Sequence, residues 1–111
     1  FGQLGSMYTA ASNAAISPPT NKVFIAITMV TDTTFDSSTG LIADNDSVGA
    51  GLEYIGTATA AHNVSDGSET TSTGSEGLVV NSVIFPAGIT IYGRWTEIDI
   101  ATGSCIAYIG A

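Results

Sequence analysis

The sequence predicts an all-β fold, a small antiparallel sandwich or partly open barrel with an extended N-terminal arm. Ile and Val together account for 19 of the 111 residues, whereas Leu accounts for four. β-branched side chains fit a pleated sheet well, while Leu favours helices. Short apolar segments alternate with segments rich in Gly, Ser and Thr, which form turns and loops. A chain of this length is enough for one domain with one modest core.

The first 21 residues are predicted to be an arm, and residues 22–111 a single β domain. Within the arm, Ser6–Ala15 has the composition of a short helix, which Pro18 and Pro19 must end. A segment rich in Gly, Ala and Ser has little apolar surface to bury on its own. Two interpretations therefore remain open: a flexible tail, or a strap that becomes ordered on a neighbouring subunit.

The clearest strand is Lys22–Thr31, where apolar residues occupy both alternating sets of positions. Its odd-numbered residues are predicted to face one side of the sheet and its even-numbered residues the other. Because both sets are apolar, we expect this strand to be covered on both faces. Asp32–Asn45 is predicted to be a loop interrupted by one apolar pair, Leu41-Ile42. Leu52–Thr59 is the second predicted strand, with Gly56 at a bulge or a close backbone approach.

The second half of the chain is predicted to hold three more strands. His62–Gly77 has no apolar periodicity and is a long loop, either functional or mobile. Leu78–Phe85 is the third strand and Ile89–Ile100 the fourth. The apolar positions of the fourth strand change parity, which a bulge near Gly93 would reconcile. After a short turn, Cys105–Ile109 is expected to return as its antiparallel partner. One or two short additional strands would complete the fold.

Charged residues are few, and most of them are acidic. Lys22 and Arg94 are the only Lys or Arg residues, against ten carboxylates, for a formal net charge of −8. Binding to nucleic acid by phosphate neutralisation needs several cations on one face, and an anionic membrane surface needs the same. We therefore expect neither partner. The longest apolar run, Val23–Ile27, is also far shorter than the roughly 18 residues that span a bilayer.

The surface is predicted to be rich in hydroxyl groups. Only 11% of residues are charged, and the sequence holds 12 Ser and 15 Thr. The mean hydropathy of +0.34 is nevertheless high for such a polar composition. Few charges also mean weak repulsion between copies. We therefore expect some apolar surface to be buried against partners and not inside the monomer.

Residues that could support catalysis or bind a metal are few and poorly spaced. His62 is the single histidine, and Cys105 the single cysteine, which excludes an internal disulfide and a multi-cysteine zinc site. Asp44–Gly49 begins like a calcium loop, but apolar residues occupy two positions where an EF-hand needs oxygen ligands. Glu97 and Asp99 share a strand face roughly 7 Å apart, with no cleft indicated. We expect no catalytic residue, no metal and no cofactor.

The segment Phe85–Thr96 holds the residue types that dominate protein interfaces. It contains the single Trp and the single Arg of the chain, together with a Tyr and a Phe. Arg, Trp and Tyr are the residues most enriched at interface hot spots. The predicted partner-contact residues are therefore Phe85, Tyr92, Arg94 and Trp95. For Trp95, a place in the core is the competing interpretation.

Several segments that together make up about half of the chain carry a resemblance to a known group of proteins. They are Lys22–Ile27, Asp32–Asp36, Tyr54–Thr57, Phe85–Thr96 and Cys105–Gly110. The chain resembles small structural proteins encoded by tailed phages, most closely those of marine and cyanobacterial phages. Residues 63–76 have no counterpart in that resemblance.

The resemblance implies a component of the virion, an extracellular particle, without enzymatic activity. Small β proteins of this kind often decorate or cement the head, commonly as trimers on the lattice of the major capsid protein. We therefore expect a head decoration or cement protein that associates with itself and stabilises the capsid lattice. One alternative is a subunit of a tail tube, a fibre or another extracellular filament. Another is a glycan-binding β module that uses Trp95 and Tyr92 as a stacking platform.

Overall fold

The structure, a computed structural model, describes residues 3–44, 54–57 and 77–111. Within these residues there is no helix, and hence none that could span a membrane. The described residues form seven antiparallel strands. These are β1 (Ser6–Ala10), β2 (Val23–Met29), β3 (Thr34–Phe35), β4 (Leu41–Ala43), β5 (Thr90–Ile98), β6 (Ile100–Thr102) and β7 (Ser104–Gly110).

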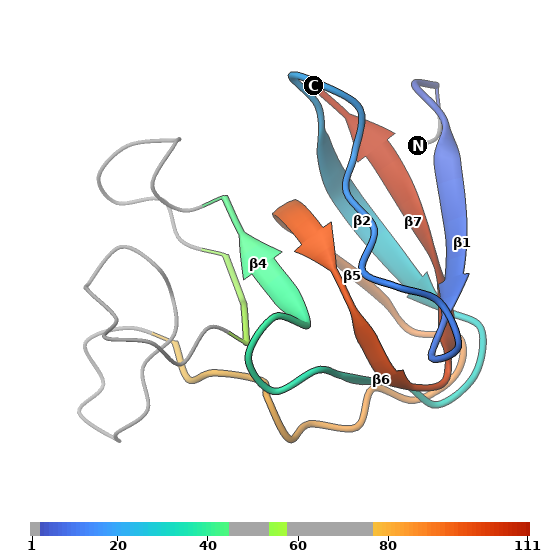
Figure 1. Ribbon diagram of the computed structural model, residues 1–111, viewed down its shortest axis with the longest axis vertical. Helices are drawn as coiled ribbons and strands as arrows, with labels where there is room; N and C mark the ends of the chain where they lie inside the picture. Colours follow the sequence, from blue (N-terminus) through green and yellow to red (C-terminus); the bar gives the residue numbers. More distant parts are fainter. Residues whose placement is uncertain (1–2, 45–53, 58–76) are drawn as a thin grey trace.

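The strands make two sheets that share one core (Figure 1). The larger sheet has the order β1-β7-β2-β5-β4, and the smaller pairs β3 with β6. The larger sheet stays open, with β1 at one edge and β4 at the other. The predicted all-β class is therefore confirmed, as an open sandwich and not a closed barrel. The buried core cluster consists of Ile16, Phe24, Ile27, Met29, Phe35, Leu41, Phe85, Trp95, Ile98, Ile100, Cys105, Ala107 and Ile109.

The central strand β2 confirms the predicted strand at Lys22–Thr31, but its faces differ from the prediction. Phe24 and Ile27 both belong to the core cluster although their sequence separation is odd. The reason is a register shift between Phe24 and Ala26, which pairing with both β5 and β7 shows. Ile25 and Thr28 are only half-buried. The expectation that the strand is covered on both faces is therefore met only in part.

Strand β5 is irregular at two places. Tyr92 pairs with Ala26 of β2 and Trp95 with Phe24, so three steps along β5 oppose two along β2. The predicted bulge near Gly93 is confirmed by this shift. A second shift, opposite β4, lies between Trp95 and Glu97. It allows Trp95 and Ile98 to face the same core despite their odd separation.

Two predictions about the middle of the chain are wrong. The predicted loop Asp32–Asn45 contains β3 and β4, because each short segment finds a distant partner, β6 and β5 respectively. The described part of the predicted strand Leu52–Thr59, residues 54–57, is not a strand. Thr57 instead makes a local contact, in which its hydroxyl oxygen accepts the Leu41 N–H at 2.8 Å. The close approach predicted at Gly56 is confirmed, since a Cβ there would lie 3.0 Å from the Leu41 carbonyl oxygen.

The strand predicted at Leu78–Phe85 is also absent. A turn at residues 81–82 interrupts the segment, and Val83 and Ile84 are exposed. Phe85 pairs with Thr33 by two backbone hydrogen bonds of 2.8 Å, Leu78 forms one isolated bridge, and the Val80 N–H donates to the Gly56 carbonyl oxygen at 3.1 Å. The Phe85 ring packs edge-on against Phe35, with ring centroids 5.5 Å apart. The segment is therefore anchored at separate points and does not form a ladder.

The N-terminal segment, predicted to be an arm with the composition of a short helix, contains a strand. β1 pairs with β7 from Ser6, opposite Tyr108, to Ala10, opposite Ser104. The backbone groups that a helix would bond internally are satisfied by β7, which no local pattern in the sequence reveals. Ile16 adds a two-hydrogen-bond bridge to Ile98 and lies in the core. The described part of the predicted arm therefore packs on its own chain.

The C-terminal strand has different neighbours from those predicted. β7 lies between β1 and β2, and β2 separates it from β5. The cause is the turn between β6 and β7, where Gly103 has a φ of 95°. A Cβ at Gly103 would collide with the carbonyl oxygen of Asp32. This tight, left-handed position lets β6 pair with β3 and sends β7 into the centre of the larger sheet.

Candidate functional site

The four predicted partner-contact residues do not form one surface. Phe85 and Trp95 are 8% and 0% exposed and belong to the core. Tyr92 is 62% exposed, while the Arg94 side chain is partly covered. Only Tyr92 therefore offers a large side chain to an outside partner.

Trp95 is held in place by the bulge of β5. Its indole N–H donates a hydrogen bond of 2.8 Å to the carbonyl oxygen of Ile55. Its ring lies over Gly93, where a Cβ would be 2.7 Å from Trp95 Cζ2. The ring is thus fully used inside the molecule and is not accessible for stacking on a ligand.

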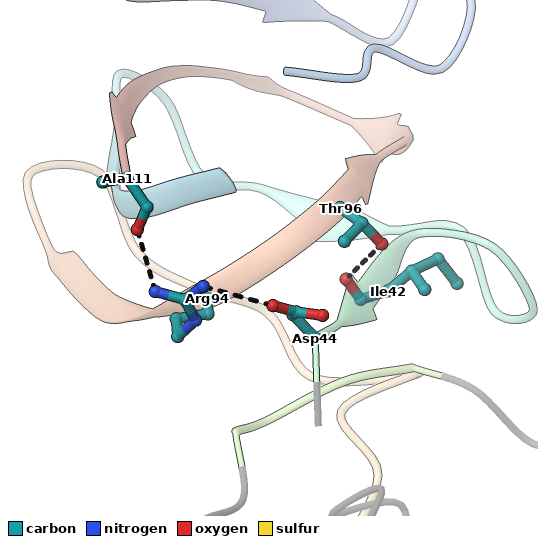
Figure 2. Close-up of polar contacts among 5 residues, drawn as sticks. All are labelled: Ile42, Asp44, Arg94, Thr96 and Ala111. Carbon is teal, nitrogen blue, oxygen red and sulfur yellow. Dashed lines mark hydrogen bonds and ion pairs between the residues drawn. The ribbon is translucent and has the colours of Figure 1, made fainter. Parts of the chain in front are cut away.

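Arg94 joins three segments of the chain (Figure 2). Its Nη2 lies 3.3 Å from Asp44 Oδ2, immediately after β4, and its Nη1 donates to the backbone oxygen of Ala111 at 2.9 Å. The Asp44 side chain is only 9% exposed. Arg94 therefore compensates a buried carboxylate and is largely committed to interactions within its own chain.

The outer face of the larger sheet, the face opposite the core, carries large side chains that are accessible. The strand register places Tyr8, Ile106, Thr28 and Thr90 in one row across β1, β7, β2 and β5. The hydroxyls of Thr28 and Thr90 lie 2.8 Å apart. Tyr8 is 64% exposed, and Tyr92 in the neighbouring row is 62% exposed.

Sequence reasoning missed Tyr8, because its segment is predicted to be an arm and not a strand of the domain. The signal was present in the alternation of β1, where Ser6 and Tyr8 are exposed while Met7 and Thr9 face the core. Over five residues this period-two pattern is too short to distinguish from a chance arrangement in an arm of small residues. The pairing with β7 shows that this alternation belongs to a β-strand.

The candidate functional site is the outer face together with the β1 edge of the sheet. No charged residue occurs in β1, β2 or β7. In the sequence, residues 1–21 and 100–111 carry no charge at all, although the chain has a net charge of −8. The charged residues of the described part lie in β5, in the turns, next to β4, as with Arg94 and Asp44, or directly before β2, as with Lys22. The β1 side of the molecule is thus its uncharged side.

His62 lies outside the described residues, as do residues 45–49 of the calcium-like loop. Cys105 is buried, and burial raises the pKa of its thiol to about 12. Asp99 accepts a hydrogen bond of 3.3 Å from the Thr39 hydroxyl, and Glu97 is half-buried. Among the described residues no group of three or more His, Cys, Asp or Glu side chains is placed to hold a metal ion.

Comparisons of this chain with protein-family models, with curated proteins and with solved structures find no match.

Proposed function

We propose that the protein is a non-enzymatic structural component of a phage particle, a head decoration or cement protein. It acts by association with copies of itself and with other virion proteins such as the major capsid protein. The observation that carries this proposal is the uncharged side of a chain with a net charge of −8, formed by β1, β7 and β2 with Tyr8 exposed on it. Such a surface is suited to close contact between copies, since no like charges meet there.

The mechanism is stabilisation by buried area. A standard protein interface buries about 1,600 Å² and repeats around a symmetry axis in an oligomer. Exposed tyrosines supply large contact area at low cost in side-chain entropy. Tyr8 and Tyr92 have this character on the outer face. Phe85 and Trp95 contribute indirectly, by fixing the segments that carry the surface.

The glycan-binding alternative loses its main element, because the Trp95 ring is fully buried. The filament alternative, a tail tube or fibre subunit, needs head-to-tail contacts that repeat without closing. Electron microscopy of the purified protein separates it from the head protein, since only an open contact gives filaments.

The proposal is tested by sedimentation velocity of the purified chain and by co-sedimentation with phage heads that lack their accessory proteins. We expect a mass that is a multiple of 11.2 kDa at micromolar concentration, together with saturable binding to the heads. A monomer that also stays in the supernatant would overturn the proposal. So would turnover of a small molecule by the purified chain.

A further inference from the structure

Strand β1 presents an unpaired backbone edge. In its antiparallel ladder with β7, the Gly5 carbonyl accepts the Ile109 N–H and the Ala11 N–H donates to the Gly103 carbonyl. Because the direction of the backbone groups alternates along a strand, the odd-numbered residues of β1 bond to β7. The N–H and C=O groups of Ser6 and Tyr8 therefore point away from the sheet, where the structure describes no further strand (Figure 1).

The two edges of the larger sheet differ in their protection. Edge strands of monomeric proteins are usually short, irregular, charged or interrupted by proline, since an exposed regular edge recruits another strand. β4 has three residues, a register shift and the Arg94–Asp44 pair beside it. β1 has five residues in regular register, without a charge, a proline or a bulge. Of the two edges, β1 is the one open to a further strand.

The charge distribution identifies the incoming strand as a second copy of the same chain. Repulsion between two molecules of charge −8 is weakest where the uncharged sides meet, because salt screens charges beyond roughly 8 Å. An acidic or basic partner strand would find no complementary charge at β1. A second β1 offers the same uncharged sequence and a matching set of outward N–H and C=O groups.

We propose that two copies associate by antiparallel pairing of β1 with β1, which joins their larger sheets into one continuous sheet. The two-fold axis passes between the two Tyr8 residues, so that Ser6 of each copy lies opposite Ala10 of the other. This register pairs both backbone groups of Tyr8 with those of the second Tyr8, and the Ser6 carbonyl with the Ala10 N–H. The Ala10 carbonyl already accepts the Asn13 N–H at 2.9 Å within its own chain. The register also places the two exposed Tyr8 rings side by side on the outer face, as a cross-strand aromatic pair. The inference rests on the proposed function in that both require self-association.

The first test compares the masses of three proteins by sedimentation velocity over a range of concentrations. We expect the wild-type chain to reach twice 11.2 kDa, and Tyr8→Lys to weaken this association at least about tenfold, since like charges then meet directly opposite each other. Tyr92→Lys is the matched control, because Tyr92 is equally exposed on the same face but lies on β5. It should associate as the wild type does. Equal weakening by both variants would indicate face-to-face docking and overturn edge pairing.

The second test measures the register by oxidative cross-linking of single-cysteine substitutions. In the proposed pair the two Tyr8 Cα atoms are about 5.5 Å apart, within the range that a disulfide spans. Tyr8→Cys should therefore form a covalent dimer rapidly. Ser6→Cys is the control, because Ser6 of one molecule lies roughly 13 Å along the strand from Ser6 of the other molecule. Native Cys105 is buried in both variants.

The outcomes separate this inference from the proposed function. If the wild-type chain is a monomer by mass and Tyr8→Cys does not cross-link, self-association itself fails. If the chain is an oligomer whose mass Tyr8→Lys leaves unchanged, the β1 pairing is wrong while self-association stands. Cross-linking of Ser6→Cys as fast as Tyr8→Cys would also overturn the pairing, because it would show random collisions.

Discussion

The guanidinium group of Arg94 lies 3.3 Å from the carboxylate of Asp44 and ties the middle of β5 to the end of β4. The carboxylate is the more buried partner, at 9% exposure against 30% for the Arg94 side chain. Removing the cation therefore leaves a buried negative charge, whereas removing the carboxylate charge leaves a cation with access to water. The two halves of the pair should respond unequally to substitution.

We predict that Arg94→Met lowers the free energy of unfolding by about 1–3 kcal/mol, and Asp44→Asn by about 1 kcal/mol or less. The partial exposure of Arg94 keeps the first value below that of a fully buried pair. Urea unfolding followed by the fluorescence of Trp95 measures both. Arg94→Lys is the control that retains the charge, and it should lie between wild type and Arg94→Met. An equal cost for Arg94→Met and Asp44→Asn would contradict the asymmetry.

The contact between Gly93 and the Trp95 ring predicts a coupled pair of substitutions. Gly93→Ala puts a methyl group 2.7 Å from Cζ2 and 2.9 Å from Cη2 of Trp95. Such overpacking should cost about 1–3 kcal/mol. In the Trp95→Phe background both atoms are missing, so Gly93→Ala should cost about 1 kcal/mol less there. A double-mutant cycle from denaturant unfolding gives the coupling, and strict additivity would show that the ring is not the obstacle.

Burial of Cys105 predicts a thiol that is inert in the folded protein. Because burial raises the pKa of the thiol from 9.0 to about 12, its thiolate fraction at neutral pH is roughly a thousandfold smaller than in the unfolded chain. Alkylation by iodoacetamide, followed by mass spectrometry, should therefore be slow until urea unfolds the protein. The same raised pKa makes the neutral thiol stabilising below pH 9.0, and this contribution is lost as the pH rises toward about 12. Rapid labelling of the native protein would argue against the buried position.

The turn after β3 predicts an acid-sensitive element. The Asp36 carboxylate accepts the backbone N–H groups of Ser38 and Thr39, each at 3.0 Å, and then both hydroxyls. These bonds, the one from the Ser38 N–H first, hold the pKa of Asp36 below its ordinary value of 3.8. The contribution to stability is therefore present above pH 3.8 and is lost as the pH falls through the lowered pKa.

Thermal unfolding of wild type and Asp36→Asn across this acidic range tests the prediction. The midpoint of the wild type should exceed that of Asp36→Asn at neutral pH, and the difference should shrink as Asp36 becomes protonated. Exposed Ser37→Ala is the control within the same turn and should show no such pH dependence. A difference that grows on acidification would reverse the sign and refute the carboxylate's role.

The sequence by itself determined the all-β class and the positions of the long strands. Lys22–Thr31, Ile89–Ile100 and Cys105–Ile109 are rich in β-branched residues. The first two contain β2 and β5 of the larger sheet, and the third lies within β7. The parity change along Ile89–Ile100 located the bulge near Gly93, because side chains must alternate and an apolar set that changes side needs an extra residue. The residue types of the interface candidates were also visible, but not which of them are exposed. Trp95 is buried and Tyr92 is exposed, although both are aromatic residue types that are enriched at interfaces.

Only the tertiary structure decided the short strands, the strand order and the surface. β1 and β4 have five and three residues, too few for a periodic signal, and they are strands because β7 and β5 supply their hydrogen bonds. Leu78–Phe85 looked more like a strand than either, yet it has no ladder partner among the described residues and forms only isolated bridges. A short extended segment gains its stability from a neighbour distant in the chain, so its own residues cannot specify it. For the same reason, the exposed position of Tyr8 depends on the pairing with β7, which places β1 at the edge of the sheet.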